Sequence, residues 1–392
     1  MLMMQHHRKH TLIYVVLAAA SLVSSYSYGA TDPNAAVVEV RKTCLDNGVA
    51  RNNCFTDFGP LKNWINTARL QKPSSDAPLK VEIGPGTFGT FSLTCNASSG
   101  FTGYISFVGA GVGNTVILSP GFGAGLKVQN CTELGFSDLS IGSVSYGGVT
   151  WSGGGNSSWN NVHIFGPGNL WYADYCGASK GKHYWTSSRI TATAGVGSSN
   201  AYYEVCDESW FFGSELTASV PQNTNGGGAG MVTANQQGEI HIYGSVLRAL
   251  IDGNAGSMAV VSTGIDGGGG GSIHIHGTGI DAISNTGKNL TVLSAANGGH
   301  IHANVSSYFI QTTGSSTRIV NNGGHIHAPY QWEHIPDPDS DPATPSGFTS
   351  VNGADMTTIS TGTSDGKPHL IIYSADCPAD TRWYDAVDKV CR

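Results

Sequence analysis

Charged side chains are scarce in this chain of 392 residues. Asp, Glu, Lys and Arg together make up 12% of it, whereas hydrophobic residues make up 40% and 54 residues are Gly. Disordered chains carry more charge and less hydrophobicity, so the composition indicates a folded protein. The net charge of −7 gives no indication of a nucleic acid or an anionic membrane as a partner.

Long apolar runs are absent after residue 30, so nothing later in the chain is expected to span a bilayer. Before that point, basic residues at 6–10 precede an apolar run at 12–22, and small residues follow. This order is typical of a secretory signal peptide. We expect residues 1–30 to be cleaved and the protein to be secreted, outside the cell or into a periplasm, with an uncleaved anchor as the alternative.

Catalytic motifs and helical periodicity are both nearly absent. The sequence holds no Gly-x-Ser-x-Gly elbow, so a hydrolase triad has no support. Helical periodicity is confined to residues 34–70, whose apolar positions would let an amphipathic helix cover the end of a longer domain. We therefore expect residues 31–80 to form an N-terminal cap.

Short repeats dominate the second half of the chain. Residues 297–303 and 322–328 both read Asn-Gly-Gly-His-Ile-His-Ala, and looser copies occupy residues 238–244 and 271–277. Each copy alternates its side chains as a short strand does, which gives a column of Ile and a neighbouring column of His. The His column consists of His241, His274, His302 and His327. Strand repeats at periods of 25 to 33 residues predict a β-solenoid.

An earlier pair of segments carries a resemblance to a known family. Residues 81–88 and 104–118 form two strand-like stretches, the second with Gly-x-Gly ahead of Thr-Val-Ile. This pattern resembles the first coils of the right-handed parallel β-helix proteins of the pectin lyase-like superfamily. The resemblance covers residues 80–335 and implies an all-β fold, a single right-handed parallel β-helix. It is one of architecture, since the catalytic motifs of the superfamily's lyases, hydrolases and methylesterases do not occur in this sequence.

The chain therefore divides into four parts. The signal peptide and the cap precede the parallel β-helix at residues 81–335, and a Pro-rich linker with a disulfide-bonded tail occupies residues 336–392. A last strand is expected at residues 370–373. Eight Cys in an exported chain suggest four disulfides. The expected pairs are Cys44–Cys54, Cys95–Cys131, Cys176–Cys206 and Cys377–Cys391.

Two acidic residues form the candidate catalytic pair. When the segments before Cys176 and Cys206 are aligned on these cysteines, Asp174 lies over Glu204 on the outer face of adjacent coils. Stacked strands are about 4.8 Å apart, which matches the carboxyl separation of retaining glycosidases and would set the two pKa values apart. The alternatives are a solvated acidic ladder and a Ca²⁺ site.

Aromatic residues are the candidate carbohydrate contacts. Tyr172 and Tyr202 would flank the carboxylate pair as rings for sugar stacking. Trp159, Trp185 and Trp210 align into a column that leads into the His column. Facing outward, Trp185 and Trp210 would grip a glycan chain; facing inward, the column would be core.

Basic residues would assist the same chemistry. His163 and Arg189 hold matched positions on successive coils, with Glu215 near the next. Lyases of the superfamily that the chain resembles use basic groove residues to remove a proton beside a carboxylate, so His163 and Arg189 are candidate catalytic residues. The alternative is a plain salt bridge between Arg189 and a nearby acid.

The His column offers a third surface. Several imidazoles on one strip can bind Zn²⁺, Ni²⁺ or Cu²⁺. Neighbouring rings would stack without converging, and the repeats hold no Asp or Cys that completes a tetrahedral set. A solvated ladder is therefore the favoured interpretation, and no metal ligand is assigned.

Two functions remain open. The first is a secreted enzyme that hydrolyses or β-eliminates an extracellular polysaccharide, with Asp174 and Glu204 as acid and base. The second is a non-catalytic surface or matrix protein that binds glycans along the solenoid, as an adhesin or scaffold. Both take a polysaccharide as partner, by analogy with solenoids of this type. No cofactor is expected, although the carboxylate pair could hold Ca²⁺.

Overall fold

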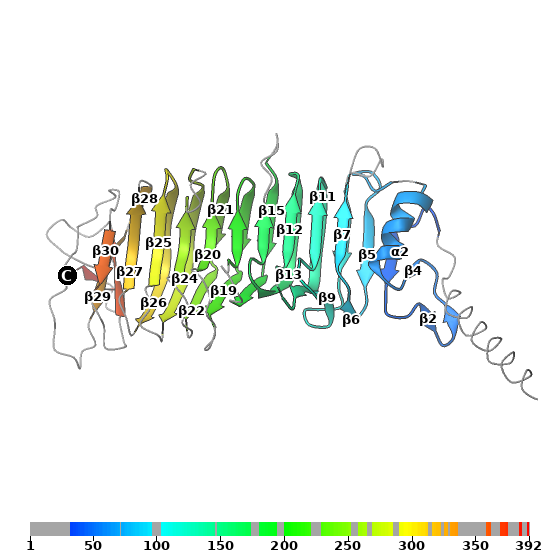
Figure 1. Ribbon diagram of the computed structural model, residues 1–392, viewed down its shortest axis with the longest axis horizontal. Helices are drawn as coiled ribbons and strands as arrows, with labels where there is room; N and C mark the ends of the chain where they lie inside the picture. Colours follow the sequence, from blue (N-terminus) through cyan, green and yellow to red (C-terminus); the bar gives the residue numbers. More distant parts are fainter. Residues whose placement is uncertain are drawn as a thin grey trace, which may run out of the picture.

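Parallel strands wound into an elongated solenoid make up most of the molecule (Figure 1). The computed structural model describes residues 32–70, 72–95, 103–145, 147–173, 180–193, 200–220, 229–251, 258–264, 269–284, 290–312, 316–322, 325–327, 330–335, 358–361, 369–374, 384–385 and 390–391. The expected signal peptide and Pro-rich linker lie outside these ranges, as do Asp174, Cys176 and Cys377. Among the described helices, none is long and apolar enough to cross a membrane.

Each coil contributes three strand segments, which stack on the equivalent segments of the neighbouring coils. We call the 10-stranded sheet face I. Its strands are β7 (Phe91–Thr94), β10 (Leu126–Gln129), β12 (Val149–Ser152), β14 (Trp171–Ala173), β17 (Tyr202–Glu204), β20 (Ala229–Ala234), β23 (Met258–Thr263), β25 (Leu290–Ala296), β27 (Ser316–Asn322) and β30 (Thr358–Thr361). All neighbours pair in parallel from β7 to β27, whereas β30 closes the sheet antiparallel.

The 19-stranded sheet is bent along its length into two faces. Face II consists of β5 (Leu79–Ile83), β8 (Ile105–Val108), β15 (Lys182–Thr186), β18 (Glu208–Phe212), β21 (Glu239–Tyr243) and β28 (His325–His327). Face III consists of β6 (Gly86–Phe88), β9 (Thr115–Ser119), β16 (Arg189–Thr193), β19 (Glu215–Val220) and β22 (Val246–Ile251). Four longer strands run through both faces: β11 (Glu133–Ser143), β13 (Asn156–Pro167), β24 (Ser272–Ser284) and β26 (His300–Thr312). The expected all-β fold, a right-handed parallel β-helix, is confirmed.

A column of residues with positive φ makes the bend between faces II and III. Its members are Asp138, Asn161, Ser187, Gly213, Gly244 and Gly277, all with φ between 49° and 55°. A left-handed conformation costs other residues about 1–2 kcal/mol, whereas Gly adopts it freely. The Gly-Ser and Gly-Thr pairs that recur in the sequence are therefore corners of successive coils.

Hydroxyl groups continue the hydrogen bonding between coils just after this bend. The backbone N–H of Ser188 donates to Ser214 Oγ at 3.2 Å, and that of Ser214 donates to Ser245 Oγ at 3.1 Å. Val162 N and Ser245 N make the same contact with Ser188 Oγ and Thr278 Oγ1. Each hydroxyl also donates to the carbonyl two residues earlier. This hydroxyl ladder satisfies buried backbone groups where the strands turn.

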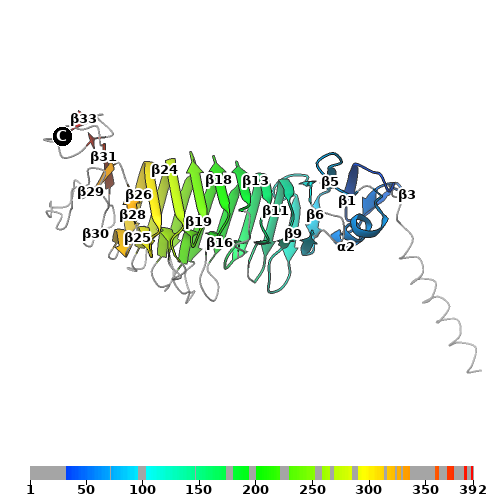
Figure 2. The same cartoon turned by 90° about the horizontal axis from the view of Figure 1, so that it is seen from above.

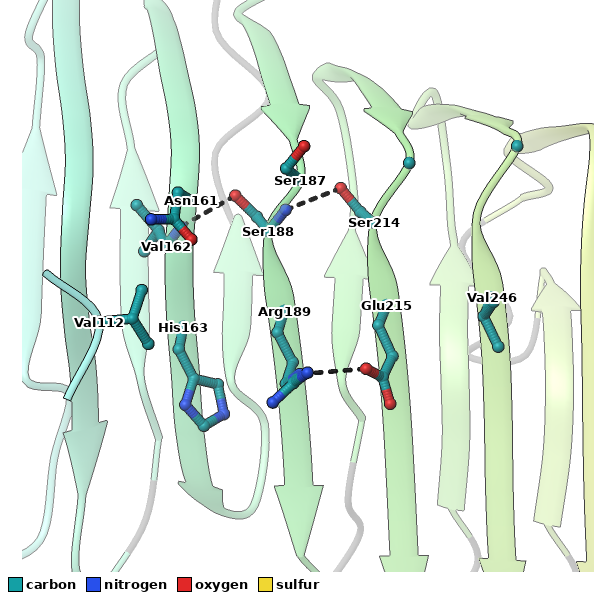
Figure 3. Close-up of a pocket in the computed structure, with 12 residues that line it drawn as sticks. Val112, Asn161, Val162, His163, Ser187, Ser188, Arg189, Ser214, Glu215 and Val246 are labelled. Atoms are coloured by element: carbon teal, nitrogen blue, oxygen red, sulfur yellow. Dashed lines mark hydrogen bonds and ion pairs between the residues drawn. The ribbon is translucent and has the colours of Figure 1, made fainter.

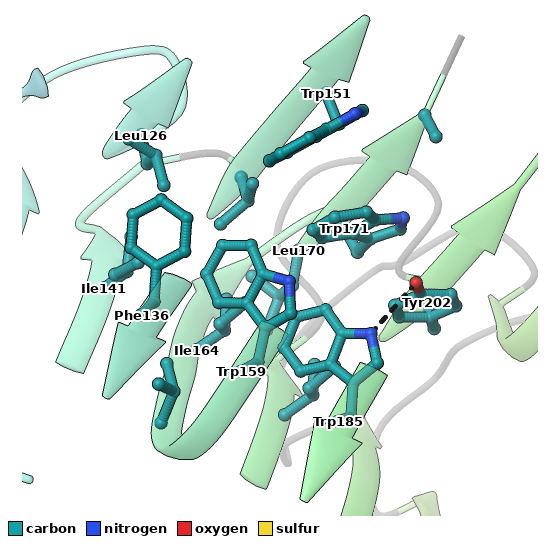
Figure 4. Packing of buried hydrophobic residues seen from close by; sticks show 14 of the residues in the cluster. Leu126, Phe136, Ile141, Trp151, Trp159, Ile164, Leu170, Trp171, Trp185 and Tyr202 are labelled. Atoms are coloured by element: carbon teal, nitrogen blue, oxygen red, sulfur yellow. Dashed lines mark hydrogen bonds between the residues drawn. The ribbon is translucent and has the colours of Figure 1, made fainter. Parts of the chain in front are cut away.

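Stacked aromatic rings fill the interior of the middle coils (Figure 4). Phe136 stacks on Trp159 at 4.2 Å between ring centroids, Trp159 on Trp185 at 4.6 Å, and Trp185 on Phe211 at 5.6 Å. Trp185 is 0% exposed. The outward placement considered for Trp185 is therefore wrong. The aligned Trp column was out of step by one residue, because Phe211 and not Trp210 continues it.

The N-terminal cap combines strands with a short helix (Figure 1, blue). Its elements are β1 (Val37–Val40), β2 (Leu45–Asp46), β3 (Val49–Ala50), β4 (Cys54–Phe55), α2 (Phe58–Asn63) and the π-helical turn η1 (Trp64–Ala68). The expected helix is confirmed at its second half, where Leu61, Trp64 and Ile65 are buried. At its first half the prediction is wrong, since β1 pairs in parallel with β5 and extends the sheet. Phe58 stacks on Phe91 at 4.4 Å, which joins the helix to the solenoid core.

The other end of the rod departs from the parallel pattern (Figure 2). Strand β29 (Tyr330–Ile335) pairs antiparallel with β31 (His369–Ser374), which confirms the strand expected near residue 370. A small ladder joins β32 (Tyr384–Asp385) to β33 (Val390–Cys391). Two of the expected disulfides, Cys44–Cys54 and Cys95–Cys131, are confirmed, with Cα atoms 5.6 and 4.9 Å apart. The other two include Cys176 and Cys377, which lie outside the described residues.

Candidate binding surface

One outward column of face II is a continuous stack of rings. We call it the face II ladder; its members are Tyr184, Trp210, His241, His274 and His302. Successive ring centroids are 5.0, 5.3, 4.7 and 4.9 Å apart, and the planes of neighbouring rings differ by 14° or less. The column of His predicted from the repeats is therefore confirmed, and its backbone register extends to His327. Trp210 faces outward, as the carbohydrate-binding prediction required.

Small residues precede the ladder in the same column. Tyr184 pairs with Ser158 on the coil before, and Ser158 pairs with Gly135 on the coil before that. The ring of Tyr184 is 41% exposed, and Ser158 is exposed as well. The column thus steps from two small residues up to a stacked ring. Asn156 and Lys182, two positions earlier in β13 and β15, border this step with polar groups. We call Tyr184, Ser158 and Gly135 the ledge.

A second outward column lies beside the first, next to the bend. Phe212, Tyr243 and His276 stack at 5.4 and 4.8 Å between centroids. The sequence analysis did not identify this column as a surface, although each of the three residues directly precedes a Gly-Ser or Gly-Thr corner. The parity of the strands was the missing information, because it decides which residues of each repeat face outward.

Charged groups border the face II ladder on one side. Lys182 Nζ lies 5.4 Å from the ring centroid of Trp210 and 3.5 Å from Glu208 Oε2. Farther along, Glu239 Oε1 lies 3.0 Å from His241 Nε2 and 3.7 Å from His274 Nε2. Sequence reasoning sought an Asp or Cys to complete a metal site among the repeats and missed Glu239.

Burial shapes the chemistry of the central imidazole in the ladder. Desolvation, and then the imidazoles of His241 and His302, lower the pKa of His274 to about 4. Protonating one ring of the stack would place its charge beside two other rings, which is why the neutral form is favoured. At neutral pH His274 therefore has a nitrogen lone pair available as an acceptor or ligand.

Glu204 faces the interior, contrary to prediction. Trp171 pairs with Tyr202, and Ala173 pairs with Glu204, so the alignment on cysteines was displaced by one residue. A one-residue slip moves every side chain to the other face of the sheet. Tyr202 and Glu204 are both 0% exposed. The outer-face placement of these two residues is therefore wrong, and Glu204 has no access to an external polysaccharide.

The buried Glu204 carboxylate is held by four donors. Oε1 accepts from the backbone N–H groups of Val205 (3.2 Å) and Asp207 (3.1 Å). Oε2 accepts from Ser209 Oγ (3.0 Å) and Trp171 Nε1 (3.3 Å). Burial raises the pKa of Glu204 and the charge of Asp207 adds to the rise, while nearby His183 and the hydrogen bonds from Asp207 N and Ser209 oppose it. The Glu204 carboxylate thus joins face I to face II inside the solenoid, since Trp171 belongs to face I and Ser209 to face II.

A chain of Ser, His and Asp lies in the same interior. Ser157 Oγ is 2.7 Å from His183 Nδ1, and His183 Nε2 is 3.2 Å from Asp207 Oδ2. Trp159 Nε1 donates to the same Ser157 hydroxyl at 2.6 Å. The distances resemble those of a catalytic triad, but the side chains of Ser157 and His183 are at most 1% exposed. The chain ties three coils together and has no route to a substrate.

His163 and Arg189 come together in a pocket just beyond the bend (Figure 3). The pocket has a volume of about 350 Å³, and Glu215 is the next residue of the same column. Arg189 Nε lies 3.0 Å from Glu215 Oε2, so the salt bridge weighed as the alternative is present. Burial, and then the charge of Arg189, lower the pKa of His163.

The charges of this pocket neutralise one another along face III. Arg248 Nη1 lies 3.0 Å from Glu215 Oε1, and Arg248 Nη2 lies 3.3 Å from Asp281 Oδ2. Arg189, Glu215, Arg248 and Asp281 thus form an alternating row. Such a row offers no excess positive charge for an acidic sugar, which weakens the case for a uronate clamp. The catalytic roles of His163 and Arg189 stay predictions.

Tyr172 faces outward on face I, as predicted, although its partner differs. Its ring stacks on Tyr203 at 5.4 Å between centroids, not on Tyr202. Asp174, which begins the neighbouring segment, lies outside the described residues. The structure therefore brings together Tyr184, Trp210 and the imidazoles, but it does not bring Glu204, Tyr202 or Trp185 to the same surface.

Comparisons with known proteins find only a distant structural likeness. No protein-family model and no curated protein matches the chain. Among solved structures it is similar to a pectin methylesterase from carrot, at 10% identity and a TM-score of 0.43, covering 71% of this chain and 83% of the other. It is also similar to a rice weevil pectin methyl esterase at 10% identity and a TM-score of 0.42, covering 67% and 81%. A pectin methylesterase in complex with hexasaccharide VII gives the same identity and TM-score, with coverage of 77% and 90%. Likeness at this level carries no argument about activity.

Proposed function

We propose that the protein binds an extracellular polysaccharide along face II, with its ledge as the main contact. The observation that supports this is the position of Tyr184 at the open end of the face II ladder. Rings inside the ladder cover one another's faces and present their edges to solvent. Tyr184 is the exception, because the coil before it carries only Ser158 at that position.

A sugar ring fits the ledge for physical reasons. The apolar face of a pyranose packs on an aromatic face, as aromatic residues with a polar end do at other interfaces. Ser158 and Gly135 leave room beside the Tyr184 ring, and Lys182 and Asn156 border that room. These polar groups would donate to or accept from the hydroxyls of the bound sugar.

The rest of the ladder suits a linear polymer. Coils repeat about every 4.8 Å, a length comparable with one sugar unit in an extended chain. Each coil then presents one ring edge to one sugar: the indole of Trp210, followed by the imidazoles of His241 and His274. Imidazole nitrogens both donate and accept, so they match hydroxyl groups without selecting for charge.

Binding without cleavage is the form of the function that the site supports best. Glu204, one of the two carboxylates expected to cut a glycan, is buried in the core. His163 lies at an ion-paired pocket on face III, away from the ladder column. The enzyme hypothesis therefore depends on Asp174 and on residues outside the described ranges.

Export is part of the same proposal. The disulfides Cys44–Cys54 and Cys95–Cys131 form in oxidising compartments and are rare in the cytosol. They support the expectation of a secretory signal at residues 1–30. A rigid, exported rod with a glycan-binding face would serve as an adhesin or a scaffold in a matrix.

Affinity electrophoresis on a panel of neutral and acidic polysaccharides tests the proposal. We expect wild-type protein to be retarded by at least one polymer and Tyr184→Ala to lose at least about tenfold in affinity. Tyr172→Ala is the matched comparison, since it removes the outward, stacked Tyr that was predicted as a carbohydrate contact on face I, and the proposal requires the larger loss in Tyr184→Ala. Retardation that is equal in wild type and Tyr184→Ala, or absent for every polymer, contradicts the proposal.

The same panel separates the binder from an enzyme. Released reducing ends and unsaturated products are followed for wild type and for Asp174→Asn. We expect no cleavage by either protein. Cleavage by wild type that disappears in Asp174→Asn would restore the enzyme hypothesis with a different partner for Asp174.

A further inference from the structure

Glu239 is the carboxylate that borders two stacked imidazoles in the described part of face II. Its Oε1 atom lies 3.0 Å from Nε2 of His241 and 3.7 Å from Nε2 of His274. One nitrogen or oxygen from each of the three residues lies within 4.8 Å of the other two. His241 follows Glu239 on β21, and His274 occupies the matching position on β24.

The two separations from Glu239 are close to those between ligands of one tetrahedral ion. Zn²⁺ binds nitrogen and carboxylate oxygen at roughly 2.0–2.2 Å. Two such ligands on one tetrahedral centre are therefore about 3.4 Å apart. The observed 3.0 and 3.7 Å lie on either side of that value. Shifts of a few tenths of an ångström would bring both contacts to it.

The strands hold the three ligands close to this arrangement. Ile240 and Ile273 are 0% exposed and fix the backbone from inside the solenoid. The side chains of His241 and His274 are 17% and 26% exposed, so packing restricts both rings while their edges stay open. Because the rings of His241 and His274 are parallel, their Nε2 lone pairs point in the same direction. A rotation of the His274 ring about χ2 would direct both lone pairs toward one ion. This torsion is soft in His.

Charge favours a cation at this place. Glu239 offers carboxylate oxygens, and His241 Nε2 is within hydrogen-bond distance of one of them at 3.0 Å. A metal ion would take the place of that shared proton. Lys182, a cation on this side of the ladder, already lies 3.5 Å from Glu208.

We propose that Glu239, His241 and His274 form a binding site for a divalent transition-metal ion, with Zn²⁺ as its probe. Two imidazoles and a carboxylate suit Zn²⁺ and related ions better than Ca²⁺, which takes oxygen ligands. Three protein ligands leave a coordination position open to water. The site shares His241 and His274 with the proposed glycan-binding face, but Zn²⁺ binding is measured without a glycan, so a failure of this proposal is distinguishable from a failure of the proposed function.

His276 provides a matched control. It belongs to the same His-Ile-His stretch as His274 and also stacks on a ring, that of Tyr243. Its column contains Phe212 and Tyr243 on the preceding coils and no carboxylate. A strip that binds ions by its imidazoles alone would need His276 as much as His274.

Calorimetric titration with ZnCl₂ tests the site. The full chain is used with His6, His7 and His10 replaced by Asn, because these N-terminal imidazoles would also bind the ion. In this background we expect one saturable site, with affinity at least tenfold weaker in Glu239→Gln and in His274→Asn. The affinity of His276→Asn is expected to stay within twofold.

Two results would overturn the proposal. One is the absence of saturable Zn²⁺ binding at millimolar concentration. The other is an equal loss in His276→Asn, which would reveal a non-specific imidazole strip. Thermal unfolding of each variant confirms that it folds. Should His274→Asn not fold, Glu239→Gln decides alone, because its side chain keeps its size and loses the ligand charge.

Discussion

Ser158 and Tyr184 occupy the same register position on adjacent coils, so the Tyr184 ring stands beside a side chain too small to cover it. The next four positions of the column carry rings that do cover one another. This step leaves one face of the Tyr184 ring uncovered by the preceding coil. The central claim of the account is that this face binds a sugar.

Inward and outward tryptophans should differ sharply in their effect on stability. Trp185 is 0% exposed and stacks on Trp159 and Phe211, so Trp185→Ala is expected to cost about 3–5 kcal/mol of unfolding free energy. Trp210→Ala, from an outward position, is expected to cost about 1 kcal/mol. Urea unfolding of both variants measures the difference. Similar losses of unfolding free energy in the two variants would contradict the assignment of Trp185 to the interior and Trp210 to the surface.

Removing one hydroxyl from the hydroxyl ladder should lower the stability of the protein. Ser214→Ala removes the acceptor of Ser188 N and leaves that buried group without its partner, at a cost of about 1–3 kcal/mol. Ser214→Thr is the matched control, since Thr278 makes the same contact on a later coil. Thermal melts should place Ser214→Ala well below Ser214→Thr. A wild-type melting temperature for Ser214→Ala would show that the ladder is dispensable.

Glu204 should make the protein less stable as pH rises. Burial holds its folded-state pKa above the usual value of 4.5, so the folded state favours the protonated form. Its contribution is therefore fully present below the unfolded pKa and is lost as pH rises through the folded pKa. The titratable groups that face it are His183, Asp207 and Tyr202.

The test compares wild type with Glu204→Gln by urea unfolding between pH 4 and pH 7. Gln places an amide donor among four donors, so this variant is expected to be less stable at every pH. The advantage of the wild type should shrink as pH rises. An advantage that grows with pH would mean that the four hydrogen bonds outweigh burial and stabilise the ionised carboxylate.

His163 should respond to the loss of its charged neighbour. The positive charge of Arg189 contributes to lowering the pKa of His163, after burial. Arg189→Ala is therefore expected to raise that pKa while leaving the ring half-buried. Titration of the His163 resonances by NMR measures the shift. Stability should change by less than about 1 kcal/mol, because Arg189 is an exposed ion-pair partner.

The fold was largely predictable from the sequence because short repeats that alternate like strands can bury their apolar residues only by stacking on one another. The identical copies with His302 and His327 pair in register as expected. The helix-like reading of residues 37–40 was wrong, since a short apolar run gives the same pattern in a helix and in a buried strand. In the structure these residues form β1, which pairs with β5 and is therefore a strand.

The candidate site was harder to predict, since one residue of register decides which side chains face outward. Aligning the segments on Cys176 and Cys206 put Glu204 outside, whereas the strands pair Ala173 with Glu204. The ledge was missed for a different reason. The Tyr184 ring is open because the small Ser158 lies beside it, and these two residues become neighbours only when their coils stack.

The most direct measurement is polysaccharide binding by Ser158→Ile. This variant keeps every residue of the ladder and places a branched aliphatic side chain beside Tyr184, which should cover its open face without presenting a new aromatic face. The polymer that retards wild type should then bind at least about tenfold more weakly, while the melting temperature stays the same or rises. Unchanged binding by a folded Ser158→Ile protein would contradict the claim that the open face of Tyr184 holds the sugar.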